Sequence, residues 1–396
     1  MPTLTPPLRI ALVCLHTSPA SDPGIGDAGG MNVVVRNQAL ALGALGHAVE
    51  VLTRRSSTEQ PAETELGENV VLRFLDAGPP APQAKGRHEE YVDEFRQAME
   101  AFGPYDIVHS HHWFSGMAAL PFTREHALPH LQSFHSIAAD PSSPLSDGER
   151  PESPGRLAGE AWLAKESDAV IAISAAEAET VVRRLGGDAE RVRVVSPGVD
   201  SEVFRLRPRS ATPYVVVAGR LDPLKGFDLA IEALGLIPAE SRPLLVVAGE
   251  ESVDYRSYPG ELSELARARG VGEAVRFVGP QSRTELAALL AEAAVVAIPS
   301  HSETYGLVAL EAAACGTPVV AAAAGGLREA VVDGVTGIVL RSREPAAWAD
   351  AISRILDDPA LQESLAITAR VRATGLSWAH SADALVAVYR HELALR

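Results

Sequence analysis

Two carboxylates lie eight positions apart around the expected start of a helix. Glu303 follows an apolar run, 293–298, and Glu311 lies in a small-residue run that begins at Gly306 and ends at Gly316-Thr317-Pro318. At about 1.5 Å of rise per residue, Glu311 lies roughly one and a half turns below Gly306. The free N–H groups and the positive dipole end at such a helix start favour an anion. The spacing predicts a site for an extended ligand that has hydroxyl groups at both ends and a diphosphate in the middle, as a nucleotide-sugar has.

A cationic pair precedes these carboxylates. Arg220 follows a predicted strand, and Lys225 follows a proline turn at the start of the next predicted helix. Together they can neutralise the charge that develops on a departing nucleoside diphosphate. Each residue also has a simpler interpretation: the cations could be surface residues at a turn, Glu303 a helix cap, and Glu311 an exposed acidic residue. Because the surroundings of Glu311 are apolar, however, its carboxylate needs a partner, which ribose hydroxyls would supply.

The elements that must position these residues alternate between strands and helices. This alternation predicts an α/β fold of two doubly wound parallel-sheet domains, with ligands bound between the strand C-terminal ends. The expected domains are 1–197 and 198–375, joined near 196–200, with a C-terminal helix, 376–396, that crosses back to the first domain. The expected strands are 9–15, 48–53, 70–75, 106–109, 130–134, 169–173 and 192–195, then 214–218, 244–248, 275–278, 295–298, 319–322 and 337–340. The expected helices include 30–45, 88–101, 156–165, 345–356, 360–373 and 378–395.

Composition excludes several classes of function. A net charge of −16 over 396 residues argues against a nucleic-acid partner, which would require a basic face. We expect no membrane span and a cytoplasmic protein, because no apolar run approaches the required length. Cys14 and Cys315 both lie in apolar segments, which predicts two buried free thiols.

The first loop is rich in glycine between residues 24 and 30, where backbone N–H groups could face a phosphate. A dinucleotide fold is the rival interpretation. The spacing is not GxGxxG, however, and Thr53-Arg54-Arg55 stands where the second strand of such a fold would end in a carboxylate. Only three lysines occur in the chain, and two of them, Lys85 and Lys225, lie in the motifs described here.

The second half resembles the retaining GT-B glycosyltransferases of family 4 in Gly219-Arg220 with Lys225-Gly226, in Glu303 with Glu311, and in Gly325-Gly326. The resemblance implies that Glu303 contacts the donor sugar, that Glu311 contacts the ribose, and that Arg220 and Lys225 bind the diphosphate. It implies catalysis that requires no metal or other cofactor. An optional Mg²⁺ site would lie near Leu290, Ala291, Ala293 and Thr317.

The first half resembles the D-inositol-3-phosphate glycosyltransferases of mycothiol biosynthesis. The matching segments are 15–33, 77–85, 109–116, 133–135 and 156–160. The resemblance implies transfer of N-acetylglucosamine from UDP-N-acetylglucosamine to 1D-myo-inositol 3-phosphate, whose phosphate would be clamped by Lys85, His112, Ser133 and Arg156. Four positions depart from the family pattern: His112 replaces Tyr, Ser133 replaces Thr, Gln281 replaces Arg, and Tyr305 replaces Phe.

The resemblance thus implies three sets of site residues. The catalytic set is Arg220, Lys225, Glu303 and His135. The donor set is Asp22, Pro23, Gly30, Arg220, Lys225, Gln281, Glu303, Tyr305, Gly306, Leu307 and Glu311. The acceptor set is His16, Asp27, Ala28, Gly29, Gly30, Met31, Asn32, Lys85, His112, Ser133 and Arg156.

The implied mechanism retains the anomeric configuration, because the leaving phosphate deprotonates the acceptor hydroxyl on the same face while His135 orients the sugar 6-hydroxyl. The resemblance also implies a homodimer. Four alternatives stay open: a sucrose-phosphate synthase, an aminocyclitol transferase, a nucleotide-sugar hydrolase or epimerase on the same fold, and a non-catalytic nucleotide-sugar-binding protein. The cations and carboxylates of the second half argue against the last, and Lys85 with Arg156 favours a phosphorylated acceptor.

Overall fold

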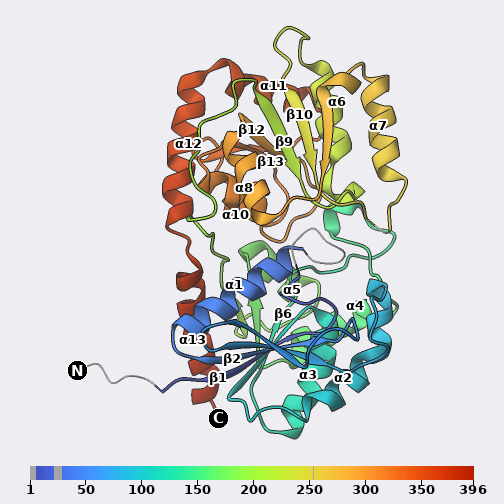
Figure 1. The fold of residues 1–396 in the computed structure, drawn as a ribbon, viewed down its shortest axis with the longest axis vertical. Helices are drawn as coiled ribbons and strands as arrows, with labels where there is room; N and C mark the ends of the chain where they lie inside the picture. The colour runs from blue at the N-terminus through green and yellow to red at the C-terminus, as the bar shows by residue number, and fades with distance from the viewer. Residues whose placement is uncertain (1–5, 22–28, 253) are drawn as a thin grey trace, which may run out of the picture.

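The computed structural model describes residues 6–21, 29–252 and 254–396, which form two α/β lobes stacked one above the other (Figure 1). Each lobe contains one sheet with helices on both faces. The predicted doubly wound α/β fold with two parallel sheets is therefore confirmed.

The first sheet has eight strands in the order β3-β4-β2-β1-β5-β6-β7-β8. Every neighbouring pair is parallel except β3 and β4. The antiparallel edge strand β3 was not among the expected strands, because its polar, exposed sequence lacks the apolar run of a buried strand. The strands are β1 Arg9–Cys14, β2 Ala48–Arg54, β3 Glu63–Gly67, β4 Val70–Leu75, β5 Ile107–His111, β6 His130–Ser133, β7 Ala169–Ala172 and β8 Val192–Val194.

The helices of the first lobe differ from expectation at one segment. The expected helix 88–101 is a 3₁₀ turn, Lys85–Tyr91, followed by α2, Val92–Met99, so Lys85 begins an ordered element. The other helical elements of this lobe are α1 Gly30–Ala44, α3 Trp113–Glu125, a 3₁₀ turn Leu145–Asp147, α4 Arg156–Glu166 and α5 Ala175–Arg183.

The second sheet has six parallel strands in the order β11-β10-β9-β12-β13-β14. Its strands are β9 Tyr214–Ala218, β10 Leu244–Ala248, β11 Val275–Gly279, β12 Val295–Ile298, β13 Val319–Ala322 and β14 Gly337–Leu340. Its helical elements are the 3₁₀ turns Pro223–Lys225 and Gly272–Ala274 and the helices α6 Phe227–Leu236, α7 Tyr258–Ala268, α8 Arg283–Glu292, α9 Leu307–Ala314, α10 Leu327–Ala330, α11 Pro345–Asp357 and α12 Pro359–Thr374.

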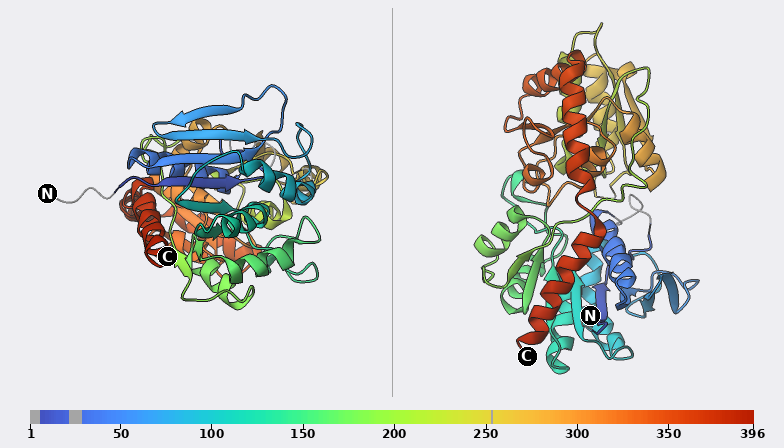
Figure 2. Two further views of the ribbon diagram at one scale, coloured as in Figure 1. Left: turned by 90° about the horizontal axis from the view of Figure 1, so that it is seen from below. Right: turned by 90° about the vertical axis from the view of Figure 1, so that its left-hand side faces the viewer.

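The C-terminal helix α13, Trp378–Ala394, runs down beside the first lobe (Figures 1 and 2). It packs against α1, where Gln38 Nε2 donates a hydrogen bond to Ser381 Oγ at 3.1 Å. The hydroxyl of Tyr389, which is fully buried, lies 2.8 Å from His109 Nδ1 beneath the first sheet. The chain therefore crosses between the lobes twice, and the two crossings meet where Val199 N donates to Leu376 O at 2.9 Å.

Two further expectations concern the core and the membrane. Cys14 and Cys315 are both buried free thiols, as predicted. In the described part of the chain, no helix combines the length and the apolar character that crossing a membrane requires.

Candidate active site between the two lobes

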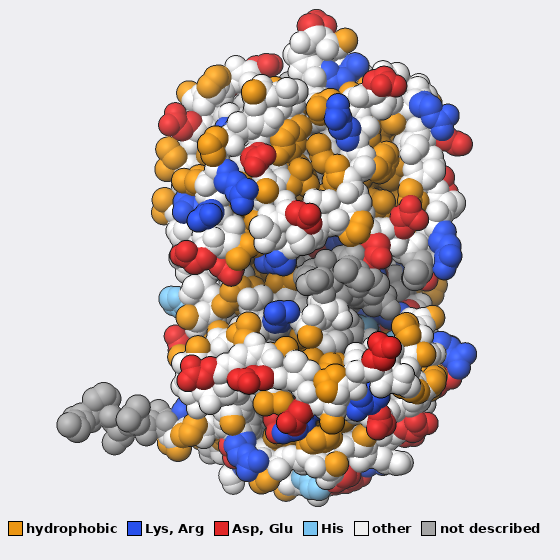
Figure 3. Space-filling model, in the orientation of Figure 1, with side chains coloured by type: hydrophobic (Ala, Val, Ile, Leu, Met, Phe, Trp, Pro, Cys, Tyr) orange, Lys and Arg blue, Asp and Glu red, His pale blue; other side chains and the backbone are white. Residues whose placement is uncertain are grey.

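A cavity of about 380 Å³ lies between the lobes, lined by residues that follow the C-terminal ends of strands in both sheets. His16, His112 and His135 come from the first lobe after β1, β5 and β6, and Arg220 and Glu250 come from the second lobe after β9 and β10. Open α/β sheets bind ligands at this edge, and the volume suits a small molecule. On the face that Figure 3 shows, basic and acidic side chains are interspersed over both lobes.

An ion pair lies in the wall that the second lobe contributes to the cavity. Lys225 Nζ donates to Glu303 Oε1 at 2.5 Å, and Ser300 Oγ donates to the same oxygen at 3.1 Å. Burial alone would lower the pKa of Lys225, but Glu303 and Asp222 raise it above its ordinary value. Lys225 is therefore a permanent cation, held beside a carboxylate that can also accept hydrogen bonds from sugar hydroxyls.

The N-terminal end of α9 lines the cavity between the lobes. Gly306 precedes the helix with φ +102°, and a Cβ there would lie 2.5 Å from Leu327 Cδ2, so the turn requires glycine. None of the described side chains caps this helix end. The start of α1 faces it, because a Cβ at Gly30 would lie 3.5 Å from Leu307 Cδ1. Two helix N-termini therefore approach each other at one cavity, which favours an anion between them.

Glu311 is buried one turn into α9, and its partner is a cation that the sequence did not single out. Arg283, the first residue of α8, forms an ion pair with Glu311, and its guanidinium lies 4.5 Å from the ring centre of the fully buried Phe204. Burial raises the pKa of Glu311, while Arg283 opposes the rise. Gln281 lines the same end of the cavity, but its side-chain amide donates to carbonyls of its own loop, such as Val278 O at 3.1 Å.

Neutral histidines form the first-lobe wall. Burial is the main reason that the pKa values of His16 and His112 lie well below the ordinary range and that of His135 falls to about 3. Within the described residues, His135 Nδ1, His16 Nδ1 and both ring nitrogens of His112 are buried and have no hydrogen-bond partner. His135 Nε2 lies 2.9 Å from His111 Nδ1. The unpartnered nitrogens give this wall hydrogen-bonding capacity without charge.

The four residues of the expected phosphate clamp do not all reach the cavity. Lys85 and His112 line it. Ser133 is the last residue of β6, and its hydroxyl contacts His109 Nε2 and Ile171 O of the neighbouring strands at 2.9 Å each. Successive side chains of a strand point to opposite faces, and the Ser133 side chain points away from the cavity. Ser136, three residues later, lines the cavity instead.

Arg156, the fourth clamp residue, is fully buried behind the cavity wall. It pairs with three carboxylates: Glu149 at 2.6 Å, Glu160 at 2.8 Å, and Glu152. Burial alone would lower its pKa, but these carboxylates raise it further above its ordinary value. Glu149 also contacts Lys85 at 3.4 Å and lines the cavity.

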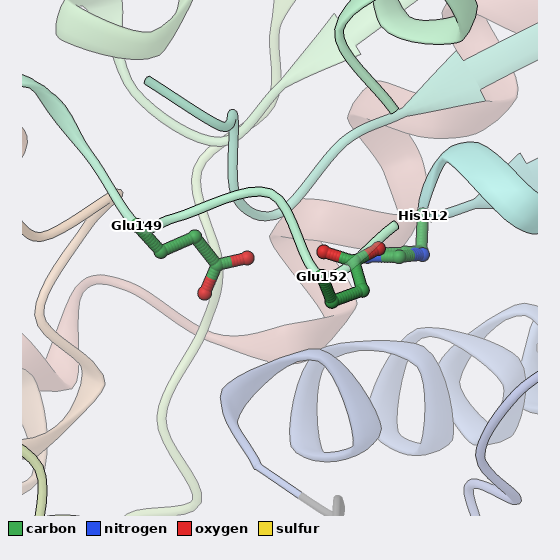
Figure 4. Close-up of side chains that lie close together, drawn as sticks. All are labelled: His112, Glu149 and Glu152. Atoms are coloured by element: carbon green, nitrogen blue, oxygen red, sulfur yellow. The ribbon is translucent and has the colours of Figure 1, made fainter. Parts of the chain in front are cut away.

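Among the described residues, His112, Glu149 and Glu152 form one cluster of metal-ligand type, with ligand atoms within 4.8 Å of one another (Figure 4). The guanidinium of Arg156 contacts both carboxylates, so a protein cation already neutralises them. At the expected Mg²⁺ position, Thr317 Oγ1 donates to Leu290 O at 2.7 Å, and the buried Ala291 and Ala293 offer backbone oxygens only. Mg²⁺ is usually held by carboxylates, so this donor set fits it poorly.

The glycine-rich loop is described only in part. Asp22, Pro23, Asp27 and Ala28 lie outside the described residues. Gly29, Gly30, Met31 and Asn32 line the cavity, together with Tyr305 and Leu307. Asn32 is buried, and its side chain holds the loop by donating to Thr17 Oγ1 at 2.9 Å and accepting from Gly29 N at 3.0 Å.

Comparison with known proteins assigns this architecture to a family. Residues 28–203 match the model described as Glycosyltransferase Family 4, and residues 199–372 match that of Glycosyl transferases group 1. The chain is 40% identical to the D-inositol 3-phosphate glycosyltransferase of Frankia alni, covering 96% of this chain and 98% of that protein. It is 39% identical to D-inositol 3-phosphate glycosyltransferase 1 of Catenulispora acidiphila, covering 97% and 96%. The chain belongs to the family 4 glycosyltransferases.

Solved structures agree with this assignment. The sucrose-phosphate synthase of Thermosynechococcus elongatus superposes with a TM-score of 0.89 at 30% identity, covering 98% of this glycosyltransferase and 100% of that chain. Anabaena HepE, solved in complex with UDP and glucose, shares the fold with a TM-score of 0.77 at 21% identity, covering 97% and 100%. The expected GT-B architecture is therefore confirmed.

The two lobes of this glycosyltransferase also contact each other directly at the cavity. Thr304 Oγ1 donates to His135 O at 2.7 Å, and Ser174 Oγ donates to Thr304 O at 2.7 Å. The carboxylate of Glu329, on α10, accepts from the first backbone N–H groups of α5, Ala175 at 2.9 Å and Ala176 at 3.0 Å. These contacts hold the lobes around the cavity.

Proposed function

We propose that this glycosyltransferase transfers N-acetylglucosamine from UDP-N-acetylglucosamine to 1D-myo-inositol 3-phosphate, with retention of configuration, in the first step of mycothiol biosynthesis. The observation that carries the proposal is the division of one cavity into two polar walls. Lys225, Glu303 and the start of α9 line the second-lobe side, which would be the donor wall, and Lys85, Ser136 and neutral histidines line the first-lobe side, which would be the acceptor wall. The names of the relatives at 38–40% identity support the same acceptor.

The donor would lie along the second lobe. Its diphosphate would meet Arg220, Lys225 and the start of α9, where a Coulombic attraction adds to that of the helix dipole. Glu311 would accept hydrogen bonds from the ribose, and Glu303 from the sugar. UDP as the nucleotide and N-acetylglucosamine as the sugar rest on the family resemblance.

The chemistry would need no protein base. The acceptor oxygen forms a bond to the anomeric carbon as the bond from that carbon to the diphosphate oxygen breaks, and the departing phosphate takes the hydroxyl proton. His135 is suited to orient a sugar hydroxyl, because its pKa of about 3 keeps the ring neutral and leaves Nδ1 free among the described residues. Lys225 stabilises the charge on the leaving group.

The decisive experiment measures UDP release from UDP-N-acetylglucosamine with inositol 3-phosphate and with free inositol. We expect a preference for the phosphorylated acceptor, and Lys85→Ala should remove that preference while the KM for the donor stays within about threefold. Lys165→Ala, on the outer helix α4, is the matched control. Equal rates with both acceptors, or UDP release that needs no acceptor, would contradict the proposed function.

A second candidate is a transferase that uses a different sugar phosphate as acceptor, as favoured by the structural match to a sucrose-phosphate synthase. The same assay with a panel of sugar phosphates distinguishes the two, because only the proposed function predicts the highest kcat/KM with the cyclitol phosphate. We further propose a homodimer that requires no metal. Sedimentation analysis and activity in excess chelator test these two points.

A further inference from the structure

We propose that the Glu149 carboxylate occupies the position that the acceptor's phosphate takes on binding, so that the phosphate must displace this carboxylate. This inference rests on the proposed function, because it concerns the same acceptor wall. It makes Glu149 a residue that sets the affinity and selectivity for a phosphorylated acceptor.

The proposal rests on the contacts of one oxygen atom, Glu149 Oε1. Glu149 Oε1 accepts from Lys85 Nζ at 3.4 Å, from Ser136 Oγ at 2.7 Å and from Arg156 NH1 at 2.6 Å. Two cations and a hydroxyl that converge on one anionic oxygen form the arrangement in which proteins bind phosphate. A side chain of the protein itself fills this arrangement.

The contacts of Arg156 show which carboxylate can leave. Its Nε–H bonds Glu160, its NH1 bonds Glu149 and Glu152, and its NH2 bonds the carbonyl and the hydroxyl of Ser136 at 3.3 and 2.9 Å. A guanidinium has five N–H donors, so none is left for a ligand unless a partner moves. The Glu160 side chain is 0% exposed and that of Glu152 is 11% exposed, whereas that of Glu149 is 30% exposed and lines the cavity. Glu149 is the partner that can move into the open space.

The displacement needs only a side-chain rotation. The backbone of Glu149 is fixed, because its carbonyl accepts from Ala139 N at 2.9 Å beside the preceding Gly148, whose φ is +135°. Glu152 is held more firmly, since Trp113 Nε1 donates to its second carboxylate oxygen at 2.7 Å. Rotation of Glu149 would leave the cations in place.

The Glu149 carboxylate and the acceptor's phosphate are both negatively charged, so they cannot occupy this position together. Burial acts to raise the pKa of Glu149, but Lys85 and Arg156 hold it well below its ordinary range, so the carboxylate is ionised at neutral pH. A phosphate beside an ionised Glu149 would share two cations with three carboxylates, and like charges at contact repel. The carboxylate therefore competes with the phosphate but not with an uncharged hydroxyl group.

The test compares the wild-type enzyme with Glu149→Gln in the UDP-release assay. The amide keeps the shape of the side chain but removes the competing charge, so the KM for inositol 3-phosphate should fall by about tenfold, an amount typical of one charge-assisted hydrogen bond. Inorganic phosphate, used as a probe, should inhibit the variant at correspondingly lower concentration. Glu149→Asp keeps the charge with a shorter reach and should give an intermediate KM.

The matched control is Glu152→Gln, which removes a carboxylate from the same Arg156 nitrogen but from behind the cavity wall. It should not lower the KM for inositol 3-phosphate. If Glu149→Gln leaves that KM unchanged or raises it in a folded enzyme that prefers the phosphorylated acceptor, the displacement is refuted while the proposed function stands. If neither enzyme prefers inositol 3-phosphate over inositol, both are refuted.

Discussion

Arg283 joins two other parts of the second lobe at the cavity, because it pairs with Glu311 of α9 and stacks over the ring of Phe204. Arg283→Ala would leave Glu311 buried without its cation, and we expect the free energy of unfolding to fall by about 1–3 kcal/mol. Loss of the charged form of Glu311 would also weaken the ribose contact, so the KM for the nucleotide-sugar should rise about tenfold. Denaturant unfolding and donor-dependent kinetics measure both effects. Arg276→Ala, at an exposed position of β11, is the control, and an unchanged donor KM in Arg283→Ala would contradict the assignment.

At the residue scale, the sequence predicted site residues that can be identified from neighbouring positions in the chain. It missed residues whose partners are far away in the sequence. Lys225, Glu303 and Glu311 follow from strand and helix boundaries that can be read nearby. Arg283 could not be selected among many arginines, because its pairing with Glu311 depends on how α8 packs against α9. The family resemblance indicated Ser133, but Ser136 lines the cavity instead, because side-chain direction changes within three residues at a strand end.

At the scale of elements, α13 packs on the first sheet through Ala382, Leu385 and Tyr389, and the Tyr389 hydroxyl adds a buried hydrogen bond to His109. Tyr389→Phe removes the hydroxyl that contacts His109 Nδ1 and leaves that nitrogen without its partner in a fully buried site. We expect a loss of about 1–3 kcal/mol in the free energy of unfolding, measured by denaturant titration. Tyr255→Phe is the control, because Tyr255 is 37% exposed. Equal stability of the two variants would show that the hydrogen bond contributes nothing to docking.

A second element-scale consequence concerns strands β5 and β6 and the residues that directly follow them, because this region buries a group of histidines with lowered pKa values. Burial holds the pKa of His130 and His135 at about 3 and those of His109, His111 and His112 well below the ordinary range. The unfolded chain therefore binds more protons than the native chain below about pH 6.5, and stability falls as the pH decreases through that range.

Carboxylates whose pKa burial raises act in the opposite direction, and they are Asp222, Glu160, Glu177, Glu311 and Glu392. Burial raises the pKa of Glu160 and Glu177 to about 7. The contribution of each residue to the free energy of unfolding is therefore lost as the pH rises from about 4.5 to 7. Among the described residues, eight histidines have a lowered pKa and so outnumber these five carboxylates. Each group contributes up to about 1.4 kcal/mol per pH unit. We expect the free energy of unfolding to be several kcal/mol lower at pH 5 than at pH 7.5, measured by urea titration at both values. A protein that is more stable at pH 5 would contradict the histidine assignment.

Most element boundaries were predicted to within two residues, because buried parallel strands form short apolar runs bounded by turn residues. The exceptions have physical causes. The antiparallel strand β3 is polar and exposed, and the segment 85–91 forms a 3₁₀ turn where a regular helix was expected. The path of α13 follows from contacts that are distant in the sequence, which local pattern alone does not determine.

At the scale of the whole molecule, the sequence predicts two lobes but not how far they are closed, because the contacts that hold them join residues more than a hundred positions apart. Glu329 is the charged member of these contacts, and it accepts hydrogen bonds from the N-terminus of α5, where a carboxylate also gains from the helix dipole. Glu329→Ala removes both hydrogen bonds without touching a residue that lines the cavity. We therefore expect the lobes to separate more readily.

Because the proposed donor and acceptor walls belong to different lobes, weaker closure should act on both substrates. In Glu329→Ala we expect the KM values for donor and acceptor to rise together by roughly threefold to tenfold, as removal of about 1 kcal/mol from the closed state implies. Small-angle X-ray scattering should show a larger radius of gyration. Arg328→Ala, at the exposed neighbouring position, should change neither quantity. A rise in only one of the two KM values would mean that Glu329 acts on a single wall, so the paired response distinguishes closure from a local effect.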